Sequence, residues 1–331
     1  MSKLPIKNEL GFFEIRLESI GGLGAHLAGK MLAEAGVLGL GLNGAHFSSY
    51  GSEKKGSPVK SFVRLGEGEI RISSPVERPH IVGVFHENLF KTIDVANGLL
   101  PDGVILVNTT KTPDEIREKF NIKSGTVAVV DALGISVEEK TRVNTAMLGA
   151  MFRIADFLNP EAMKNVIRQT FEEKYPKLVD SNIRTFDRGF NEVQFKTFEA
   201  EAGAVNEFVR AQSDLGYLTQ PMGGVIINPG NTILKDLSSS RQGFLPDFEA
   251  AKCINCAACD TACPDLCFVW EEKEDAKGRP QMFLQGIDYQ YCKGCMKCVA
   301  VCPTDALTTV REAEGFADEN RMPHRFVLAQ N

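Results

Sequence analysis

A cysteine motif that occurs twice near the end of the chain constrains the fold more than any other feature. Segment 253–264 reads CINCAACDTACP, and segment 292–303 reads CKGCMKCVAVCP. Every cysteine and the closing proline recur at an offset of 39 residues. All nine cysteines of the 331-residue chain lie between 253 and 302. The repeat predicts two equivalent sites in one small C-terminal module.

The spacing of these cysteines predicts two [4Fe–4S] clusters. Three thiolates separated by two residues can bind three corners of one cubane from a single loop, and the fourth cysteine, which precedes proline, ligates the other cluster. The ligands of the two clusters are therefore expected to cross between the motifs. The first cluster would bind Cys253, Cys256, Cys259 and Cys302, and the second Cys292, Cys295, Cys298 and Cys263.

Zinc and disulfides are the alternatives for these eight cysteines. A tetrahedral zinc site needs two C-x2-C pairs and leaves the third cysteine and both prolines unexplained, while disulfides are rare in the reducing cytosol.

The ninth cysteine, Cys267, aligns with Ala306 at the same offset, which indicates a small buried packing position. Segment 270–283 is expected to be a solvated hairpin between the motifs.

The front part of the chain has the pattern of an α/β domain. Segment 12–20 alternates apolar and polar residues as a strand does, a glycine turn follows, and residues 25–38 have helical spacing. The polar positions of 12–20 predict antiparallel or edge character for that strand. Further strands are expected at 80–85, 103–108 and 125–130, and helices at 87–100, 112–120, 142–158 and 159–175.

The glycine turn at Gly21, Gly22 and Gly24 fits neither common nucleotide motif. As a dinucleotide fingerprint it lacks the first glycine, where Ser19 stands, and residues 35–52 contain no acid for a ribose. As a P-loop it has Met31 in place of the Ser or Thr. Two interpretations stay open: backbone N–H groups that bind a phosphate or carboxylate, or a tight turn that allows close helix packing.

Segment 45–65 is expected to be a polar, glycine-punctuated loop that leads into a strand. Its lysines, Lys54, Lys55 and Lys60, would meet an anion, an acidic partner surface or solvent. The five histidines are dispersed, and no nucleophile–base pair is recognisable in residues 1–245. The front domain therefore offers no catalytic residues of its own.

Composition excludes two further classes of protein. A formal net charge of −6 and scattered basic residues indicate no nucleic-acid binding. No apolar run reaches the length of a membrane span, and the N-terminal segment lacks the apolar core of a signal peptide. We expect a cytoplasmic protein that does not enter a membrane.

These motifs together resemble the γ and δ subunits of thiamine-diphosphate-dependent 2-oxoacid:ferredoxin oxidoreductases, joined in one chain. SIGGLG (19–24) is near the family's G-x-G-G-Q-G, and SYGSEKKGSP (49–58) is near its S-Y-G-P-E-x-R-G-G. NPGNT (228–232), segment 239–253 and both cysteine motifs follow in the order of the δ part. The resemblance covers about residues 11–205 and 225–310.

The resemblance implies a γ-type sheet domain covered by helices, followed by a small bacterial-type 2[4Fe–4S] ferredoxin-like α+β module. We expect a γ-like domain at 1–215, a linker and δ-like extension at 216–245, the cluster module at 246–310 and a tail at 311–331. It also implies that thiamine diphosphate and magnesium are bound by partner α and β subunits. Electrons would pass through this chain to ferredoxin, in a dimer of heterotrimers.

The glycine loop and the SYG loop help to hold coenzyme A in family members that use it. Gly21, Gly22, Gly24, Ser49, Lys54 and Lys55 are the candidate residues here. This sequence departs from the family pattern at Ser19, Leu23, Ser52, Lys55 and Ser57. Lysine for arginine loses a planar fork that grips phosphate. Such loops suit the oxalate branch, which needs no coenzyme A, and also a drifted pyruvate enzyme, so both substrates stay open.

Two other classes of function are alternatives to a subunit of a 2-oxoacid:ferredoxin oxidoreductase. A self-contained nucleotide-dependent iron–sulfur reductase would need bound NAD or flavin, and the missing ribose acid opposes it. A ferredoxin-like carrier with an interaction domain would need no catalytic partner chains.

Overall fold

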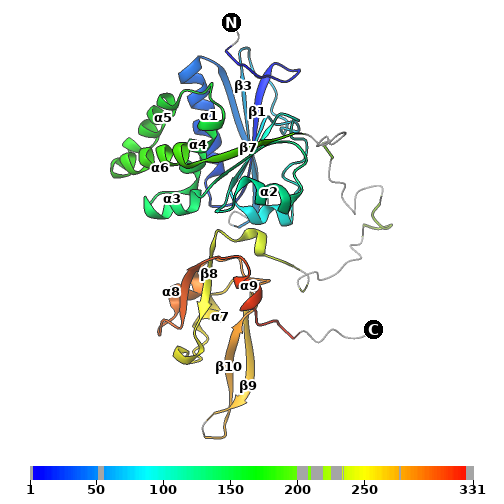
Figure 1. Ribbon diagram of the computed structural model, residues 1–331. Helices are drawn as coiled ribbons and strands as arrows, with labels where there is room; N and C mark the ends of the chain where they lie inside the picture. Colours follow the sequence, from blue (N-terminus) through cyan, green and yellow to red (C-terminus); the bar gives the residue numbers. More distant parts are fainter. Residues whose placement is uncertain are drawn as a thin grey trace. The chain divides into compact units, whose positions relative to one another are not determined.

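The computed structural model describes residues 3–50, 56–199, 208–209, 219–224, 233, 235–275 and 277–325 (Figure 1). The chain forms two compact units, Met1–Val209 and Arg210–Asn331. No helix among these residues is both long and apolar enough to span a bilayer.

A mixed sheet of seven described strands forms the centre of the front unit, in the order β2-β3-β1-β4-β5-β6-β7. β1, β4, β5 and β6 run parallel, whereas β2, β3 and β7 pair antiparallel with their neighbours. The α/β class is confirmed. The strands are β1 Phe12–Ile20, β2 Asn43–Tyr50, β3 Pro58–Gly66, β4 Ile81–Val84, β5 Val104–Asn108, β6 Gly125–Val130 and β7 Gln194–Phe198.

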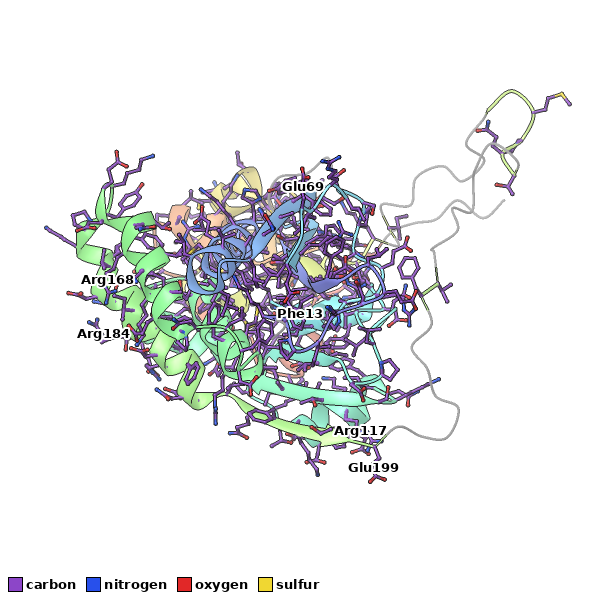
Figure 2. The ribbon with its side chains drawn as sticks, turned by 90° about the horizontal axis from the view of Figure 1, so that it is seen from above. Phe13, Glu69, Arg117, Arg168, Arg184 and Glu199 are labelled. Atoms are coloured by element: carbon purple, nitrogen blue, oxygen red, sulfur yellow. The ribbon has the colours of Figure 1, made fainter. Side chains whose placement is uncertain are left out.

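The helices α1 and α4 pack on the sheet, and α5 and α6 pack on them as a second layer. Figure 1 shows α1, α3, α4, α5 and α6 together on one side of the sheet. Figure 2 shows Arg168 and Arg184 at the outer surface of α5 and α6. The helices of this unit are α1 Ala25–Leu40, η1 Glu87–Lys91, α2 Pro113–Phe120, α3 Ala132–Glu138, α4 Val143–Ile154, α5 Pro160–Glu172, η2 Pro176–Leu178 and α6 Val179–Glu192.

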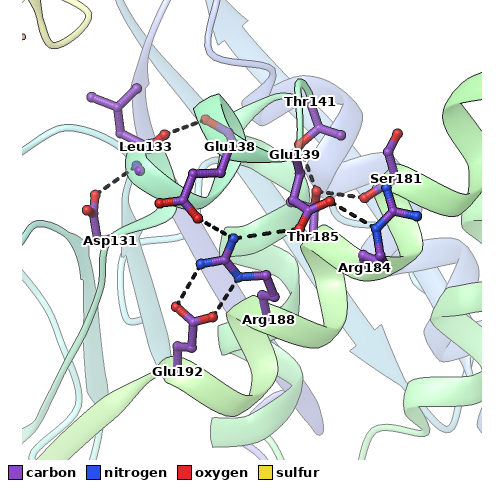
Figure 3. Close-up of polar contacts among 12 residues, drawn as sticks. Asp131, Leu133, Glu138, Glu139, Thr141, Ser181, Arg184, Thr185, Arg188 and Glu192 are labelled. Carbon is purple, nitrogen blue, oxygen red and sulfur yellow. Dashed lines mark hydrogen bonds and ion pairs between the residues drawn. The ribbon is translucent and has the colours of Figure 1, made fainter.

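Charged residues on α3 and α6 tie these two helices together at the surface (Figure 3). Arg188 contacts Glu138 at 2.6 Å and Glu192 at 2.7 Å, and Arg184 contacts Glu139 at 3.0 Å. The Thr141 and Thr185 hydroxyls form a further hydrogen bond of 2.8 Å. Exposed ion pairs add little stability singly, so the network mainly fixes the position of α6 against α3.

The prediction of antiparallel or edge character for β1 is confirmed by its antiparallel pairing with β3. The strand does not lie at an edge, and its polar residues are buried in the middle of the sheet. On the helix-covered face, Phe13 packs edge-on against Phe157, which follows α4, with 4.9 Å between the ring centroids. The opposite face holds buried ion pairs, from Arg64 to Glu14 and from Arg16 to Glu18. Burial of these charges is tolerable because they pair with each other.

Backbone carbonyls of two segments, one after β3 and one after η1, complete this polar face. Arg16 donates to the carbonyls of Val95 and Asn97 at 2.9 and 2.8 Å. Arg64 donates to the carbonyl of Ile72 at 3.0 Å. Loop backbone therefore covers the face of β1 that helices do not cover.

Three expectations for the front unit are wrong or incomplete. The helix expected at 87–100 is only the short 3-10 helix η1, which ends at Lys91 because Thr92 has a non-helical φ of −124°. Residues 45–50 of the loop expected at 45–65 belong to strand β2, which pairs with β3 over its whole length. The helices α3 and α6 and the strand β7 were not expected from the sequence. The strands near 80–85, 103–108 and 125–130 and the helices α1, α2, α4 and α5 are confirmed.

The cluster module at the C-terminal end has an internal two-fold repeat. Helices α7 and α8 lie at the sequence offset of 39, as do the starts of β9 and β11. β9 pairs with β10 as β11 pairs with β8. The hairpin expected within 270–283 is confirmed. The elements are η4 Ser238–Ser240, β8 Phe244–Phe248, η5 Ala250–Lys252, α7 Ala258–Ala262, β9 Phe268–Glu274, β10 Pro280–Ile287, α8 Lys297–Val301, β11 Leu307–Arg311 and α9 Phe316–Glu319.

Candidate functional site

The cluster module contains two cavities, and each is lined by the four cysteines that the crossed pattern predicts. Each holds about 330 Å³ of space free of protein atoms, partly open to solvent. We name them cavity I and cavity II. Cavity I is lined by Cys253, Cys256, Cys259 and Cys302. Cavity II is lined by Cys292, Cys295, Cys298 and Cys263.

Left-handed backbone turns wrap the cysteine loops around the cavities. Asn255 and Ala257 have φ of 56° and 59°, and their counterparts Gly294 and Met296 have 66° and 58°. Such conformations are costly for residues with a Cβ and persist where function needs them. In the first loop the turn directs the Asn255 N–H to Cys253 Sγ at 3.4 Å. Amide donors of this kind stabilise thiolates.

Burial makes several of the metal-free thiols hard to ionise. It raises the pKa of Cys259 to about 11 and that of Cys298 to about 12. Cluster assembly must therefore displace protons from buried thiols, and the binding energy of the metal offsets that cost. All nine cysteines are free, which leaves the disulfide alternative without support.

A tryptophan in the wall of cavity I lacks the hydrogen-bond partner that a buried indole normally has. Trp270 Nε1 is shielded from solvent and has no partner among the described residues. An indole nitrogen is a donor only, and buried donors are nearly always satisfied. A sulfur-rich group in cavity I would supply the missing acceptor, so the residues present fit an iron–sulfur cluster.

Single metal ions are the other occupants to consider. No three His, Cys, Asp or Glu side chains in the part of the chain that the structure describes converge as they would around one ion. The cysteines instead line two cavities of about the same volume, four predicted ligands to each cavity.

The ninth cysteine is buried, as predicted, and it also touches two predicted ligands. Cys267 is 3% exposed and lies in the wall of cavity II. Its thiol lies beside the sulfurs of Cys263 and Cys292. The neighbouring Cys267 thiol lowers the pKa of the Cys263 thiol to about 6.

A buried arginine holds the second cysteine loop to the strands. Arg241 donates to the carbonyl of Cys292 at 3.0 Å and pairs with Glu312 at 2.7 Å. On the other side of the repeat, Asn255 Oδ1 accepts from the Leu284 N–H at 2.9 Å. Sequence reasoning assigned no role to Trp270, Arg241 or Asn255. The available signal was Trp270, the single tryptophan of the chain, which lies six residues beyond the closing proline of the first motif.

The glycine turn of the front unit connects β1 to α1. Gly22 and Gly24 have φ of 113° and 83°, and Gly24 is the N-cap of α1. Gly21 forms backbone hydrogen bonds with Gly56 and Ser57. The structure therefore brings the glycine turn beside the end of the SYG loop (49–58). The P-loop alternative fails because Gly29 and Lys30 lie within α1.

Ser49 lies in a cross-strand row with two charged residues. The register pairs Glu18 with Lys60 and Lys60 with Ser49 across β1, β3 and β2. Glu18 is fully buried, and Lys60 Nζ reaches its Oε1 at 3.3 Å. The charge of Lys60 is therefore paired with that of Glu18, while 41% of its side chain remains exposed to solvent. Lys54, Lys55 and the NPGNT segment lie outside the described residues.

Two histidines that sequence reasoning set aside meet on the helix-covered face beside β2. The rings of His26 and His46 are 4.7 Å apart, and each contacts a serine, Ser48 at 3.1 Å and Ser61 at 2.9 Å. Burial lowers the pKa of His46 to about 4. The pair links α1 to β2 and β3 through hydrogen bonds to Ser48 and Ser61.

Comparisons with known proteins agree with both units. A family model described as pyruvate ferredoxin/flavodoxin oxidoreductase matches residues 14–192, and one described as 4Fe-4S dicluster domain matches 252–306. Pyruvate synthase subunit PorC of Thermotoga maritima is 39% identical over 186 residues, covering 55% of this chain and 95% of the relative. The common subunit gamma of the pyruvate/ketoisovalerate oxidoreductases of Thermococcus kodakarensis is 35% identical, covering 54% and 95%.

Among solved structures, the pyruvate oxidoreductase subunit PORC of Thermotoga maritima matches with a TM-score of 0.49 at 35% identity, covering 56% of this chain and 98% of that one. A 2-oxoglutarate:ferredoxin oxidoreductase of Magnetococcus marinus matches with a TM-score of 0.45 at 20% identity, covering 54% and 30%.

Proposed function

Since the chain belongs to the pyruvate ferredoxin/flavodoxin oxidoreductase family and carries a 4Fe-4S dicluster domain, we propose that it is the fused γ/δ subunit of a 2-oxoacid:ferredoxin oxidoreductase. In this role it docks on the catalytic chains and passes electrons from oxidative decarboxylation to ferredoxin. Two cavities lined by the crossed cysteine sets carry the proposal.

The cysteines of cavity I and cavity II hold one [4Fe–4S] cluster each, with Cys302 and Cys263 as the crossed ligands. A bound cluster accepts and releases one electron at a time. The chain's own residues set its surroundings: the left-handed turns place amide donors toward thiolates, and Arg241 and Asn255 fix both loops to the strands. The two loops sit in one small core, which keeps the clusters in a single rigid module.

Crossed ligation predicts an unusual pattern of iron loss. Cys253→Ser combined with Cys302→Ser damages only one cluster, so about four irons remain. The matched double variant, Cys253→Ser with Cys263→Ser, damages both clusters. Iron and sulfide are counted on anaerobically purified full-length chain. The reverse pattern would show that each motif binds its own cluster.

Thiamine diphosphate and magnesium belong to partner α and β subunits in this proposal, in a dimer of heterotrimers. The described front unit supports the division, since its polar residues near the glycine turn are held in structural pairs. Purification of the native complex tests it. Recovery of the chain without thiamine-containing partners would contradict the docking role, whatever its iron content.

Pyruvate is the substrate that the names of the relatives favour, and oxalate remains the alternative. The glycine turn, Ser49, Lys54 and Lys55 are the proposed coenzyme A contacts. Assays of the complex with pyruvate, oxalate and branched oxoacids, each with and without coenzyme A, separate these cases. If coenzyme A is used, charge reversal at Lys54 and Lys55 raises its KM and leaves the cluster spectrum unchanged.

A further inference from the structure

The polar groups that line the two cavities differ despite the repeat, and one of the differences is a buried hydrogen-bond donor. In cavity I the donor is the indole N–H of Trp270, which is buried without a partner among the described residues. The sequence offset of 39 places Thr309 at the equivalent position of the second half. Its hydroxyl already donates to Met296 Sδ at 3.5 Å. Cavity II therefore has no free donor at the equivalent position.

The backbone around Trp270 fixes the ring in the cavity wall. Trp270 lies on β9 opposite Leu284 of β10, next to a register shift between Leu284 and Gly286. Leu284 also lines cavity I, and its N–H bonds to Asn255 in the first cysteine loop at 2.9 Å. Strand β9, its hairpin partner β10 and the first cysteine loop thus meet in the wall of cavity I. A ring placed by three elements is suited to a fixed polar contact.

We propose that the Trp270 indole N–H donates a hydrogen bond to a sulfur of the cluster in cavity I and thereby raises the reduction potential of that cluster. The inference rests on the proposed function, because it requires a cluster in cavity I. Trp270 is a positioning residue in this role, since it supplies a dipole and no ligand.

The direction of the effect follows from charge. Reduction adds an electron to the cluster, and its sulfurs become better hydrogen-bond acceptors. An N–H aimed at sulfur therefore stabilises the reduced form more than the oxidised form, and hydrogen bonds to sulfur are a recognised control of cluster potential. The donor also gains, because an unsatisfied buried N–H is costly. Cavity II lacks this contact, so the two clusters should differ in potential.

The test is a redox titration of the full-length chain followed by EPR, with Trp270→Phe as the variant. Phenylalanine keeps an aromatic ring and removes the donor. The equilibrium constant for reducing one cluster should fall by up to tenfold, about 59 mV for a one-electron couple. The other cluster should keep its potential. Equal potentials in the variant and the parent chain would overturn the proposal.

A second measurement separates hydrogen bonding from altered packing. Trp270 is the only tryptophan of the chain, so a sulfur-containing tryptophan analogue, benzothienylalanine, replaces N–H by S at this one position with almost the same shape. The analogue should lower the same potential. Proton ENDOR of the reduced parent chain should also show an exchangeable proton that Trp270→Phe and the analogue lose.

Iron content distinguishes failure of this inference from failure of the proposed function. If the parent chain binds about four irons or fewer, the two-cluster function itself is wrong. If both variants keep eight irons per chain and both potentials stay unchanged, only the role of Trp270 is wrong.

Discussion

At the scale of single residues, Cys267 shows how a non-ligand can lie among ligands. Its thiol contacts the sulfurs of Cys263 and Cys292, yet its counterpart in the repeat is Ala306. We predict that Cys267→Ala keeps both clusters, with about eight irons per chain, because the four ligands of cavity II remain. Iron and sulfide analysis with an EPR spin count measures this. Loss of about four irons would make Cys267 a ligand.

His80 provides a second prediction, on stability against pH. The ring is 6% exposed and stacks on Phe13 at 4.7 Å, and its Nδ1 accepts from the Glu14 N–H at 3.0 Å. Burial lowers its pKa to about 4 from the ordinary histidine value of 6.5. Between these two pH values the unfolded state binds the extra proton, so the free energy of unfolding should fall as pH drops, at about 1.4 kcal/mol per pH unit.

His80→Asn is the matched control for this prediction, because an amide oxygen can still accept from the Glu14 N–H but does not titrate. Urea unfolding of the full chain, followed by a signal from the front unit, is measured at several pH values between 4 and 6.5. In the variant, the slope of the free energy of unfolding against pH should be smaller by the contribution of one proton. Parallel curves for the two proteins would contradict a neutral, buried His80.

Residue types were predictable from the sequence more readily than their partners. The cysteine spacing predicted the sets that line both cavities, since covalent geometry limits how such loops can wrap a cluster. The alternation of apolar and polar residues along 12–20 was also visible in the sequence. The burial of Glu14, Arg16 and Glu18 was not predictable from it. Glu14 pairs with Arg64, 50 positions away, Glu18 pairs with Lys60, 42 positions away, and Arg16 donates to loop carbonyls as well as to Glu18. A single sequence does not show such long-range pairing.

At the scale of elements, the close crossing of α4 and α6 depends on two glycines. A Cβ on Gly149 would lie 2.0 Å from the carbonyl oxygen of Phe186, and one on Gly189 would lie 2.1 Å from that of Ala146. We predict that Gly149→Ala destabilises the front unit by about 1–3 kcal/mol, because the helices must separate. The gain of about 1 kcal/mol in helix propensity does not offset this.

Thermal unfolding of the full-length chain measures the effect, with Gly68→Ala as the control. Gly68 has open space where a Cβ would be added and a backbone that other residues adopt. The control should unfold at the parent temperature. A Gly149→Ala variant as stable as the parent would mean that the helices pack less tightly than described.

The elements that sequence reasoning missed lack strong local signals. β2 reads NGAHFSSY, rich in serine and glycine, and becomes a strand because β3 offers it a complete edge. β7 is exposed along nearly its whole length, so it shows no apolar alternation. By contrast, α2 was predictable, since it begins with a capping box formed by Thr112 and Glu115 and has Pro113 in its first turn.

At the scale of the whole molecule, the two units have different kinds of core. The front core is built from aliphatic and aromatic side chains of strands and helices. The core of the cluster module includes Cys259, Cys292 and Cys298, which are predicted ligands, and it encloses both cavities. The resemblance predicted the division of labour between these units, whereas periodicity alone predicted only an α/β domain and a metal module.

This difference predicts the result of removing iron. Anaerobic chelation should abolish slow hydrogen exchange in β9, β10 and β11 of the full-length chain, because the metal–thiolate bonds supply folding free energy. Without them, two hollow cavities and buried thiols replace the centre of a small core. Strands β1, β4 and β5 of the same molecules should keep their protection, which provides an internal control. Slow exchange that persists in both units after iron is lost would mean that apolar packing alone holds the cluster module together.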